Sequence, residues 1–530
     1  MKKISRRAFL RNAGIGVVCL LARPDRVFGQ ATGLQHNRPN PAGLTQQTEP
    51  FVPDVEVAVT ALEKWVQILP GAKTRVWGYE GALLSGSGAT VENIPGSYLG
   101  PIIRIQSGKK IRFTFNNNLP EESVIHPHGL RVPENCDGQP MQAIGPGQSL
   151  TYDFPVIDPA CPAWFHPHPM MRPAYQVAMG LAGLFYVTDP QEEAAVPGAG
   201  TGANDLPVVI QDRTFDSNNQ ILYSPNNMWG YLGNRILVNG KPNAAFSLEP
   251  RAYRLRILNG SNARTYKLAW SNGMAVQVIG TDGGLLPQVE SRSYVMLMPG
   301  ERIDVWADFS KSAGKQVILR SLSFQPGGGM MGGGGGGMGG GGMGGMGTSL
   351  ANGAAFNILA VNVGRKATTR PVLGLLPQMP VRFNETNVDN FTTPVPFTLG
   401  MQHMVWTING RVYEDMVAAD DEMVYRDDPI AWEWVNNTPI PHPMHLHTVQ
   451  FQVVQRIAPY TTSYSTVNQG FIDSGWKDTV SVWPGERVKI AMNFGPDLGM
   501  YMYHCHILEH EDMGMMRNFM IMDMDGEMPM

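Results

Sequence analysis

The chain has 530 residues, of which 43% are apolar and 16% charged, and its formal net charge is −4 at pH 7. This composition is typical of a globular protein too long for one hydrophobic core, so we expect three or four domains. An acidic chain has no electrostatic basis for binding nucleic acid, and that class of function is excluded.

The first 29 residues predict an export signal rather than part of the fold. Ser5-Arg6-Arg7-Ala8-Phe9-Leu10-Arg11 precedes a short apolar run, Ala13 to Ala22, and a small-residue cleavage site ending at Gly29. This order is typical of a twin-arginine signal, which predicts a periplasmic protein; an amphipathic helix is the alternative. Removing residues 1–29 leaves 34 basic and 44 acidic residues and a formal charge of −10. The apolar run is too short for a stable membrane span, and no later segment predicts one.

Two sequence patterns recur along the rest of the chain, which contains 60 Gly and 41 Pro. A Pro-Gly turn leading into an alternating strand occurs at 145–154, 298–309 and 483–494. A strand that runs into asparagine occurs at 111–118, 253–259 and 431–437. Three copies of each pattern predict an all-β protein with three similar domains, each a β-sandwich.

We expect these domains at 50–190, 205–365 and 378–525, with boundaries in the acidic, Gly/Ala-rich stretch before Asp205 and between 363 and 380. The middle domain has Asn-Ala-Arg-Thr-Tyr at 262–266 where the others have histidines, so we interpret it as structural. It includes a segment of 16 Gly and 5 Met at 327–347. Such a composition cannot form a core and predicts a mobile loop, either a bare insertion or a Cu(I)-collecting arm built from soft thioethers.

Ten of the twelve histidines fall in four clusters, which predicts metal binding. On a strand, residues i and i+2 share a face, so each His-x-His pair can offer two imidazoles to one metal cluster. The isolated His36 and His403 are interpreted as ordinary surface or core residues. The clusters are His126 with His128, His166 with His168, His442 with His445 and His447, and His504 with His506 and His510.

The last cluster also contains sulfur ligands. Cys505 stands between His504 and His506, and Met515 follows ten residues later. If this segment is a strand, Cys505 faces one metal site while its two neighbours face another. Two histidines, a cysteine and a weak axial methionine make a blue-copper site. Zinc is the rival metal, but one structural zinc does not need eight further imidazoles, and the His-Cys-His fusion favours electron transfer between copper centres.

Two other cysteines remain after residue 29, Cys136 and Cys161. Export would place them in an oxidising compartment, so we predict a disulfide between them. The alternative is two small buried hydrophobic residues.

These clusters, in this order, resemble the multicopper oxidase family, and the resemblance spans the chain beyond the signal. It is closest to bacterial three-domain laccases and cuprous oxidases. The resemblance implies three consecutive cupredoxin-like Greek-key β-sandwich domains that hold four copper ions: one type 1, one type 2 and a type 3 pair. It assigns type 1 copper to His442, Cys505, His510 and axial Met515, type 2 copper to His126 and His445, and the type 3 pair to His128, His166, His168, His447, His504 and His506.

The resemblance also implies an exported, monomeric oxidase with a role in copper tolerance. It would take single electrons from Cu(I), Fe(II), phenols or aromatic amines and pass them through Cys505 to O₂, which is reduced to water. Asp137 and Glu511 match positions that protonate the oxygen intermediates. A non-catalytic cupredoxin-repeat protein for copper storage or division is the alternative, but it should have lost ligands that this chain keeps. A third hypothesis is a copper nitrite reductase, but such an enzyme does not need the eight imidazoles outside the cysteine site.

The sequence departs from the family pattern at three positions. Pro127 stands where the family often has tryptophan. Thr438 and Ile440 occupy the places of an Asp and a Met that dock Cu(I) in one subgroup of cuprous oxidases. That docking site cannot be transferred to this chain, so a Cu(I) route would use the Gly/Met segment or other methionines.

Overall fold

The computed structural model describes residues 50–94, 96–198, 204–327, 350–366, 369, 371–379, 381–459 and 461–524. The predicted signal at 1–29, His36 and all of the Gly/Met segment beyond Gly327 lie outside the described residues. Within the described ranges, every helix is too short or too polar to cross a bilayer.

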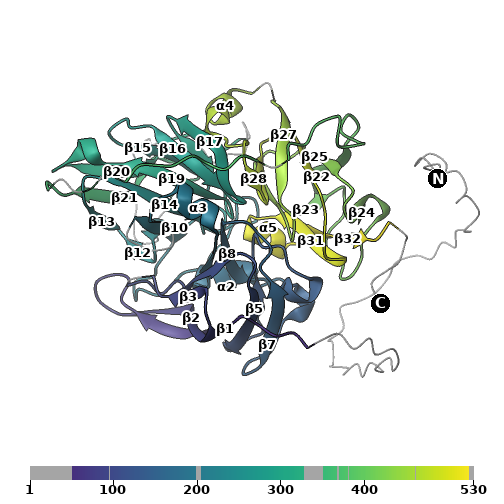
Figure 1. Ribbon diagram of the computed structural model, residues 1–530, viewed down its shortest axis with the longest axis horizontal. Helices are drawn as coiled ribbons and strands as arrows, with labels where there is room; N and C mark the ends of the chain where they lie inside the picture. Colours follow the sequence, from purple (N-terminus) through teal and green to yellow (C-terminus); the bar gives the residue numbers. More distant parts are fainter. Residues whose placement is uncertain are drawn as a thin grey trace, which may run out of the picture. The chain divides into compact units, whose positions relative to one another are not determined.

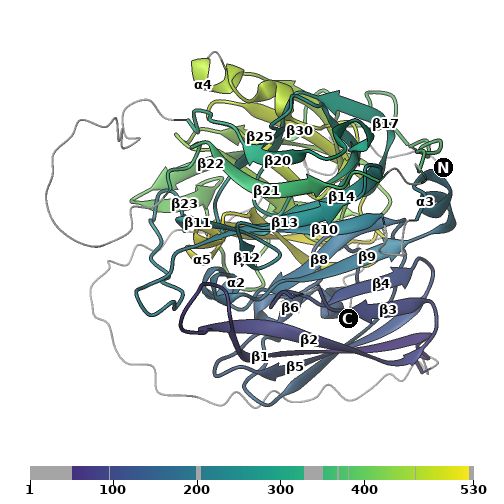
Figure 2. The same ribbon diagram turned by 90° about the vertical axis from the view of Figure 1, so that its left-hand side faces the viewer.

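One four-strand arrangement occurs three times, which confirms the predicted repetition. In the first copy, β1 (Val55–Val66) pairs antiparallel with β2 (Thr74–Gly86) and parallel with β5 (Lys110–Asn118), and β7 (Ser149–Pro155) pairs antiparallel with β5. Figure 2 shows β1, β2 and β5 side by side. The orders β11-β10-β14-β19 and β23-β22-β25-β30 repeat this pattern. Their bounds are β10 (Asp205–Arg213), β11 (Arg235–Val238), β14 (Ala252–Asn259), β19 (Arg302–Asp308), β22 (Val395–Gln402), β23 (Val405–Ile408), β25 (Ile430–Asn436) and β30 (Arg487–Met492).

The two recurring sequence patterns form neighbouring strands in all three copies. The strand that runs into asparagine (β5, β14, β25) pairs antiparallel with the strand that follows the Pro-Gly turn (β7, β19, β30). Further strands extend the second and third of these sheets: β12 (Lys241–Pro242), β16 (Val276–Thr281), β17 (Gly284–Arg292), β27 (Phe451–Ile457) and β28 (Trp476–Lys477).

Each repeat has a second sheet of five strands. The orders are β3-β4-β9-β8-β6, β13-β21-β20-β15-β18 and β24-β32-β31-β26-β29. The first contains β3 (Ala89–Glu92), β4 (Ile102–Gln106), β6 (Ile125–His126), β8 (Cys161–Pro167) and β9 (Gly183–Thr188). The second contains β13 (Ala245–Leu248), β15 (Tyr266–Trp270), β18 (Val295–Leu297), β20 (Gln316–Ser321) and β21 (Phe356–Val363). The third contains β24 (Met423–Tyr425), β26 (His442–Leu446), β29 (Thr479–Val482), β31 (Gly499–Cys505) and β32 (Met516–Met522).

Each pair of sheets encloses its own hydrophobic core, as expected for a cupredoxin-like β-sandwich. The paired strands come from 55–188, 205–363 and 395–522, drawn purple to blue, teal, and green to yellow in Figure 1. We propose that the domain boundaries lie between these ranges. Short helices occupy the connections: α2 (Pro173–Met179), α3 (Pro190–Ala195), α4 (Thr462–Ser465), α5 (Leu508–Asp512), and the 3₁₀ turns η1 (Glu134–Cys136), η2 (Pro140–Gln142), η3 (Ser310–Ser312), η4 (Asp420–Glu422) and η5 (Asn468–Gly470).

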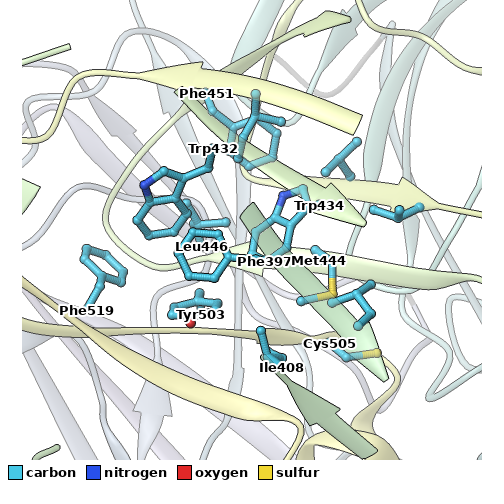
Figure 3. Close-up of a cluster of buried hydrophobic side chains, with 14 of the residues drawn as sticks. Phe397, Ile408, Trp432, Trp434, Met444, Leu446, Phe451, Tyr503, Cys505 and Phe519 are labelled. Carbon is cyan, nitrogen blue, oxygen red and sulfur yellow. The ribbon is translucent and has the colours of Figure 1, made fainter. Parts of the chain in front are cut away.

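The core of the third repeat fixes the orientation of β31. Tyr501, Tyr503 and Cys505 alternate along this strand and all pack into the core, where Trp432 and Trp434 are also fully buried. Figure 3 shows Cys505 at the edge of this aromatic cluster. Burying a large apolar side chain stabilises the fold by roughly 1.5–3 kcal/mol, so a one-residue slip of the strand would be costly.

The predicted disulfide between Cys136 and Cys161 is wrong. Every cysteine in the described part of the chain is a free thiol. The two side chains line different cavities, and Cys136 Sγ donates to the Asp153 carbonyl at 3.6 Å. Burial raises the pKa of Cys136 to about 12 and that of Cys161 well above its ordinary value. Both therefore remain protonated and behave as small buried hydrophobic residues.

Candidate metal centres

The clustered histidines sit where strands end. Strands β6, β8 and β31 each contain one histidine and β26 contains two, and a further histidine lies one or two residues beyond the end of each strand. The expectation that both members of a pair share one strand therefore holds only in part. In the first pair, for example, His128 N donates to the His126 carbonyl at 3.1 Å and closes a tight turn. Such turns let a two-residue spacing direct both imidazoles into one centre.

The sulfur centre brings together three of the predicted residues. Cys505 Sγ lies 3.3 Å from His442 Nδ1 and 3.6 Å from His510 Nδ1. All three side chains are buried, and their ligand atoms lie within 4.8 Å of one another. Met515 is buried in the same core, and its carbonyl accepts from Cys505 N at 3.1 Å. Nitrogen and sulfur donors of this kind suit copper.

Residues that the sequence did not identify hold these two imidazoles. Thr438 Oγ1 lies 2.8 Å from His442 Nε2, and His510 Nε2 donates to the Met228 carbonyl at 3.2 Å. The Trp406 ring lies against His510, with ring centroids 4.6 Å apart. With both Nε2 atoms engaged, each Nδ1 faces the sulfur; such outer contacts orient ligands in metal sites.

The other eight clustered histidines form a second centre between the first and third repeats. Nε2 of His126 lies 3.4 Å from Nε2 of His445, and Nε2 of His504 lies 3.1 Å from that of His447 and 3.5 Å from that of His168. The His128 and His166 rings lie 5.0 and 5.2 Å from the His506 ring, centroid to centroid. Three overlapping groups of imidazoles each have their ligand atoms within 4.8 Å.

The protonation states of this centre fit a metal. Burial is the main cause that lowers the pKa of His168 to about 3 and of His445 to about 4, and it lowers the pKa of His128, His166, His447 and His506 well below the ordinary value. Several Nδ1 atoms face protein oxygens, as in His126 to the Asp137 carbonyl at 2.7 Å and His445 to the Asp478 carbonyl at 2.9 Å. Neutral imidazoles with ring nitrogens crowded together are what a metal cluster requires.

One of these imidazoles, that of His506, stands out by its hydrogen bonding. Neither ring nitrogen of His506 has a hydrogen-bond partner among the described residues, although the side chain is buried. Buried polar atoms in native proteins are nearly always satisfied. A metal bound at this ring would supply the missing partner.

A single strand links the two centres. In the β26–β31 register, Met444 lies opposite Cys505, and His445 lies opposite His504. Successive residues of β31 point to opposite faces, so Cys505 reaches the sulfur centre and His504 reaches the eight-histidine centre. The chain continues to His506, whose amide donates to the Pro443 carbonyl at 2.7 Å. The two centres are thus a few covalent bonds apart, as the sequence predicted.

The two predicted carboxylates both touch the eight-histidine centre. Asp137 Oδ2 lies 2.9 Å from His447 Nδ1, and Glu511 lies 3.2 Å from His168 Nε2 and 3.1 Å from His504 Nδ1. Burial alone would raise the pKa of Glu511, but His504 and His168 lower it to about 2. Both side chains lie close enough to an imidazole of this centre to relay a proton to it.

A third carboxylate, Asp478, was not predicted. Its Oδ1 lies 3.0 Å from His128 Nε2, and it is bound by Arg302 from the middle repeat. Burial would raise the pKa of Asp478, but Arg302 and then His128 hold it well below the ordinary value. The Pro-Gly turn before Arg302 also contacts the centre, because a Cβ on Gly300 would meet the His506 ring at 2.9 Å. The middle repeat, which contains no histidine, therefore buttresses the centre.

Comparisons with known proteins agree with this geometry. Two family models described as multicopper oxidase match residues 65–192 and 385–525. A multicopper oxidase of Staphylococcus haemolyticus is 31% identical over 425 residues, which cover 79% of this chain and 81% of that protein. The crystal structure of the McoA multicopper oxidase from the hyperthermophile Aquifex aeolicus superposes with a TM-score of 0.72 at 34% identity, covering 89% of this chain and 97% of that one. The cell division protein FtsP of Xenorhabdus nematophila is 29% identical over 535 residues, which cover 96% of this chain and 97% of that protein.

Proposed function

The chain belongs to the multicopper oxidase family, and from that premise we propose that it is an exported oxidase that couples one-electron oxidation of a small donor to reduction of O₂ to water. Four copper ions bound at the two centres would supply this redox chemistry. The sulfur centre would hold type 1 copper through His442, Cys505, His510 and axial Met515. The eight-histidine centre would hold type 2 copper through His126 and His445, and the type 3 pair through His128, His166, His168, His447, His504 and His506.

The observation that carries this proposal is the connection through β31. Cys505 contacts both imidazoles of the sulfur centre, while the residue before it contacts His168 and His447 in the other centre. A protein that only stores metal has no need to join two ligand sets through one buried cysteine. An oxidase needs this connection, because electrons accepted at one site must reach the oxygen site.

The carboxylates around the eight-histidine centre, where O₂ would be reduced, would control the supply of protons. Asp137 and Glu511 lie on different imidazoles of the centre and would each supply protons as O₂ is reduced. Reduction to two waters consumes four protons, which the buried cluster cannot draw directly from bulk solvent. Asp478, which is held by Arg302, would instead orient His128 and His445.

We propose Cu(I) as the preferred donor, with Fe(II), phenols and aromatic amines as others, and a role in periplasmic copper tolerance. This preference rests on the five methionines of the Gly/Met segment, because thioethers select Cu(I). The periplasmic location rests on the twin-arginine pattern in residues 1–29. The protein would act as a monomer.

The similarity to FtsP favours one alternative, a non-catalytic protein with cupredoxin repeats that takes part in division or copper storage. The ligand sets discriminate between the two functions. A chain without oxidase activity is not expected to retain two buried ligand sets, and all twelve side chains that we propose as ligands are buried in this chain.

Steady-state O₂ consumption by the copper-loaded chain tests the proposal. We expect O₂ uptake with Cu(I) and slower uptake with a phenol. Removing residues 327–347 should reduce the rate with Cu(I) and leave the rate with the phenol unchanged. Absence of O₂ uptake with every donor, in protein that contains copper, would favour the non-catalytic alternative.

A further inference from the structure

A cavity of about 340 Å³ opens between the segment after His168 and the loop before β32. His168 and Glu511 line it, and both are buried. Its other walls include four methionines, namely Met170, Met171, Met513 and Met516. The first two are exposed, by 42% and 68%, so the cavity extends from solvent to an imidazole of the eight-histidine centre.

The exposed methionines are not explained by packing. Met171 has a φ of 56°, a left-handed conformation that is uncommon for a residue other than glycine, and its side chain is mostly in solvent. A large apolar side chain in that position gains little from burial.

The cavity combines soft ligands with an unpartnered buried oxygen. Thioethers prefer Cu(I) to harder cations. Beside them lies the Asp512 carboxylate, whose buried Oδ1 has no hydrogen-bond partner within the described ranges. The free oxygen offers a further polar ligand inside the cavity, and the sulfur atoms select a soft cation.

We propose that this cavity binds Cu(I) through methionine thioethers and admits it to the eight-histidine centre during copper loading. All eight imidazoles are buried, so copper needs an opening that reaches one of them. The inference rests on the proposed assignment of His168 as a copper ligand. In the transfer, Cu–S bonds to the thioethers break as Cu–N bonds to neutral imidazoles form; copper remains Cu(I), and no electron or proton moves.

The first test is silver binding by the copper-loaded full chain, because Ag(I) resembles Cu(I) as a soft cation but does not donate electrons. The double variant M170S/M171S removes the two exposed thioethers of the cavity. The control M404S/M416S removes two methionines outside it that match in exposure, 66% and 47%, and that both have a positive φ, 66° and 55°, as Met171 does. Any Ag(I) bound by methionines of the Gly/Met segment is the same in both variants, because both retain that segment.

We expect M170S/M171S to lose one tightly bound Ag(I) relative to wild type, and the control to keep it. The second test loads the metal-free chain with Cu(I) or with Cu(II). Loading with Cu(I) should slow about tenfold in M170S/M171S alone, whereas loading with Cu(II) should be unchanged. Equal Ag(I) binding in both variants, or an unchanged rate of Cu(I) loading, would overturn the inference. A failure of the copper assignment would look different: wild type would retain no copper after loading, whatever the silver result.

Discussion

Arg302 of the middle repeat and Asp478 of the third form a buried bidentate ion pair, with Nη1–Oδ1 at 2.7 Å and Nη2–Oδ2 at 2.6 Å. The same carboxylate lies 3.0 Å from His128 Nε2 in the first repeat. One salt bridge thus ties all three repeats to the eight-histidine centre. Asp478 can orient an imidazole only while Arg302 compensates its buried charge.

Replacing Arg302 with methionine should therefore be strongly destabilising. Removing one partner of a buried ion pair leaves an uncompensated charge and costs about 3–5 kcal/mol. The thermal unfolding midpoint of R302M should fall well below that of R426M, in which the half-exposed pair Arg426–Asp523 is broken. The exposed pair is worth about 0–1 kcal/mol. Equal midpoints for the two variants would show that the Arg302 pair does not support the structure.

Most of the residues that meet in the two centres were predictable, because they lie close together in sequence and their side chains are of types that bind copper. Asp478 was missed for the opposite reason. It stands alone in sequence, and its contacts with Arg302 and His128 reach across 176 and 350 residues. A Lys-Asp pair directly before the buried strand β29 was the available signal, since charged residues are rarely buried without partners.

The strand repeats were also predictable, because alternating burial leaves a pattern with a period of two. That Cys136 and Cys161 remain free thiols was not predictable. Nothing in the spacing of Cys136 and Cys161 indicates that their side chains face different cavities. The interpretation of the middle repeat as structural did not anticipate the contacts that Gly300 and Arg302 make with the eight-histidine centre.

Asp137→Asn should slow O₂ reduction by about 100-fold and leave the type 1 absorption band unchanged, because a positioned proton donor contributes 10²–10⁴-fold. Asp137 contacts His447 and lies away from the sulfur centre. Stopped-flow reoxidation of the reduced enzyme measures this step. Glu134→Gln, in the same 3₁₀ turn, is the control and should keep the wild-type rate. Normal reoxidation of D137N would remove Asp137 from proton delivery.

Thr438→Val should weaken the binding of copper at the sulfur centre. The substitution keeps the shape of the side chain but removes the hydroxyl that lies 2.8 Å from His442 Nε2. Loss of such an outer contact typically costs 10–100-fold in metal affinity. Competition with a chelator, followed through the type 1 absorption band, measures the change. Thr407→Val is the control, since that buried hydroxyl has no partner within the described residues. If both variants keep equal affinity, Thr438 does not orient the ligand.

Asp205 should stabilise the folded protein at neutral pH and lose this contribution at acid pH. Burial would raise its pKa, but Arg256, Arg254 and Arg104 lower it below the ordinary value. An aspartate with a lowered pKa stabilises the fold above its unfolded pKa of about 3.9, and this contribution is lost as the pH falls through the folded value. D205N should therefore unfold at a lower temperature than wild type at pH 7, with a difference that narrows progressively below a pH of about 4. A difference that stays constant with pH would contradict this.

The connection through Cys505 is tested most directly by the visible spectrum and turnover of the copper-loaded chain, compared with those of Cys505→Ser. We predict an intense charge-transfer band in the red for wild type, and loss of both the band and O₂ turnover in the variant, which keeps the eight-histidine centre. A wild-type spectrum without that band, or normal turnover by C505S, would contradict the account.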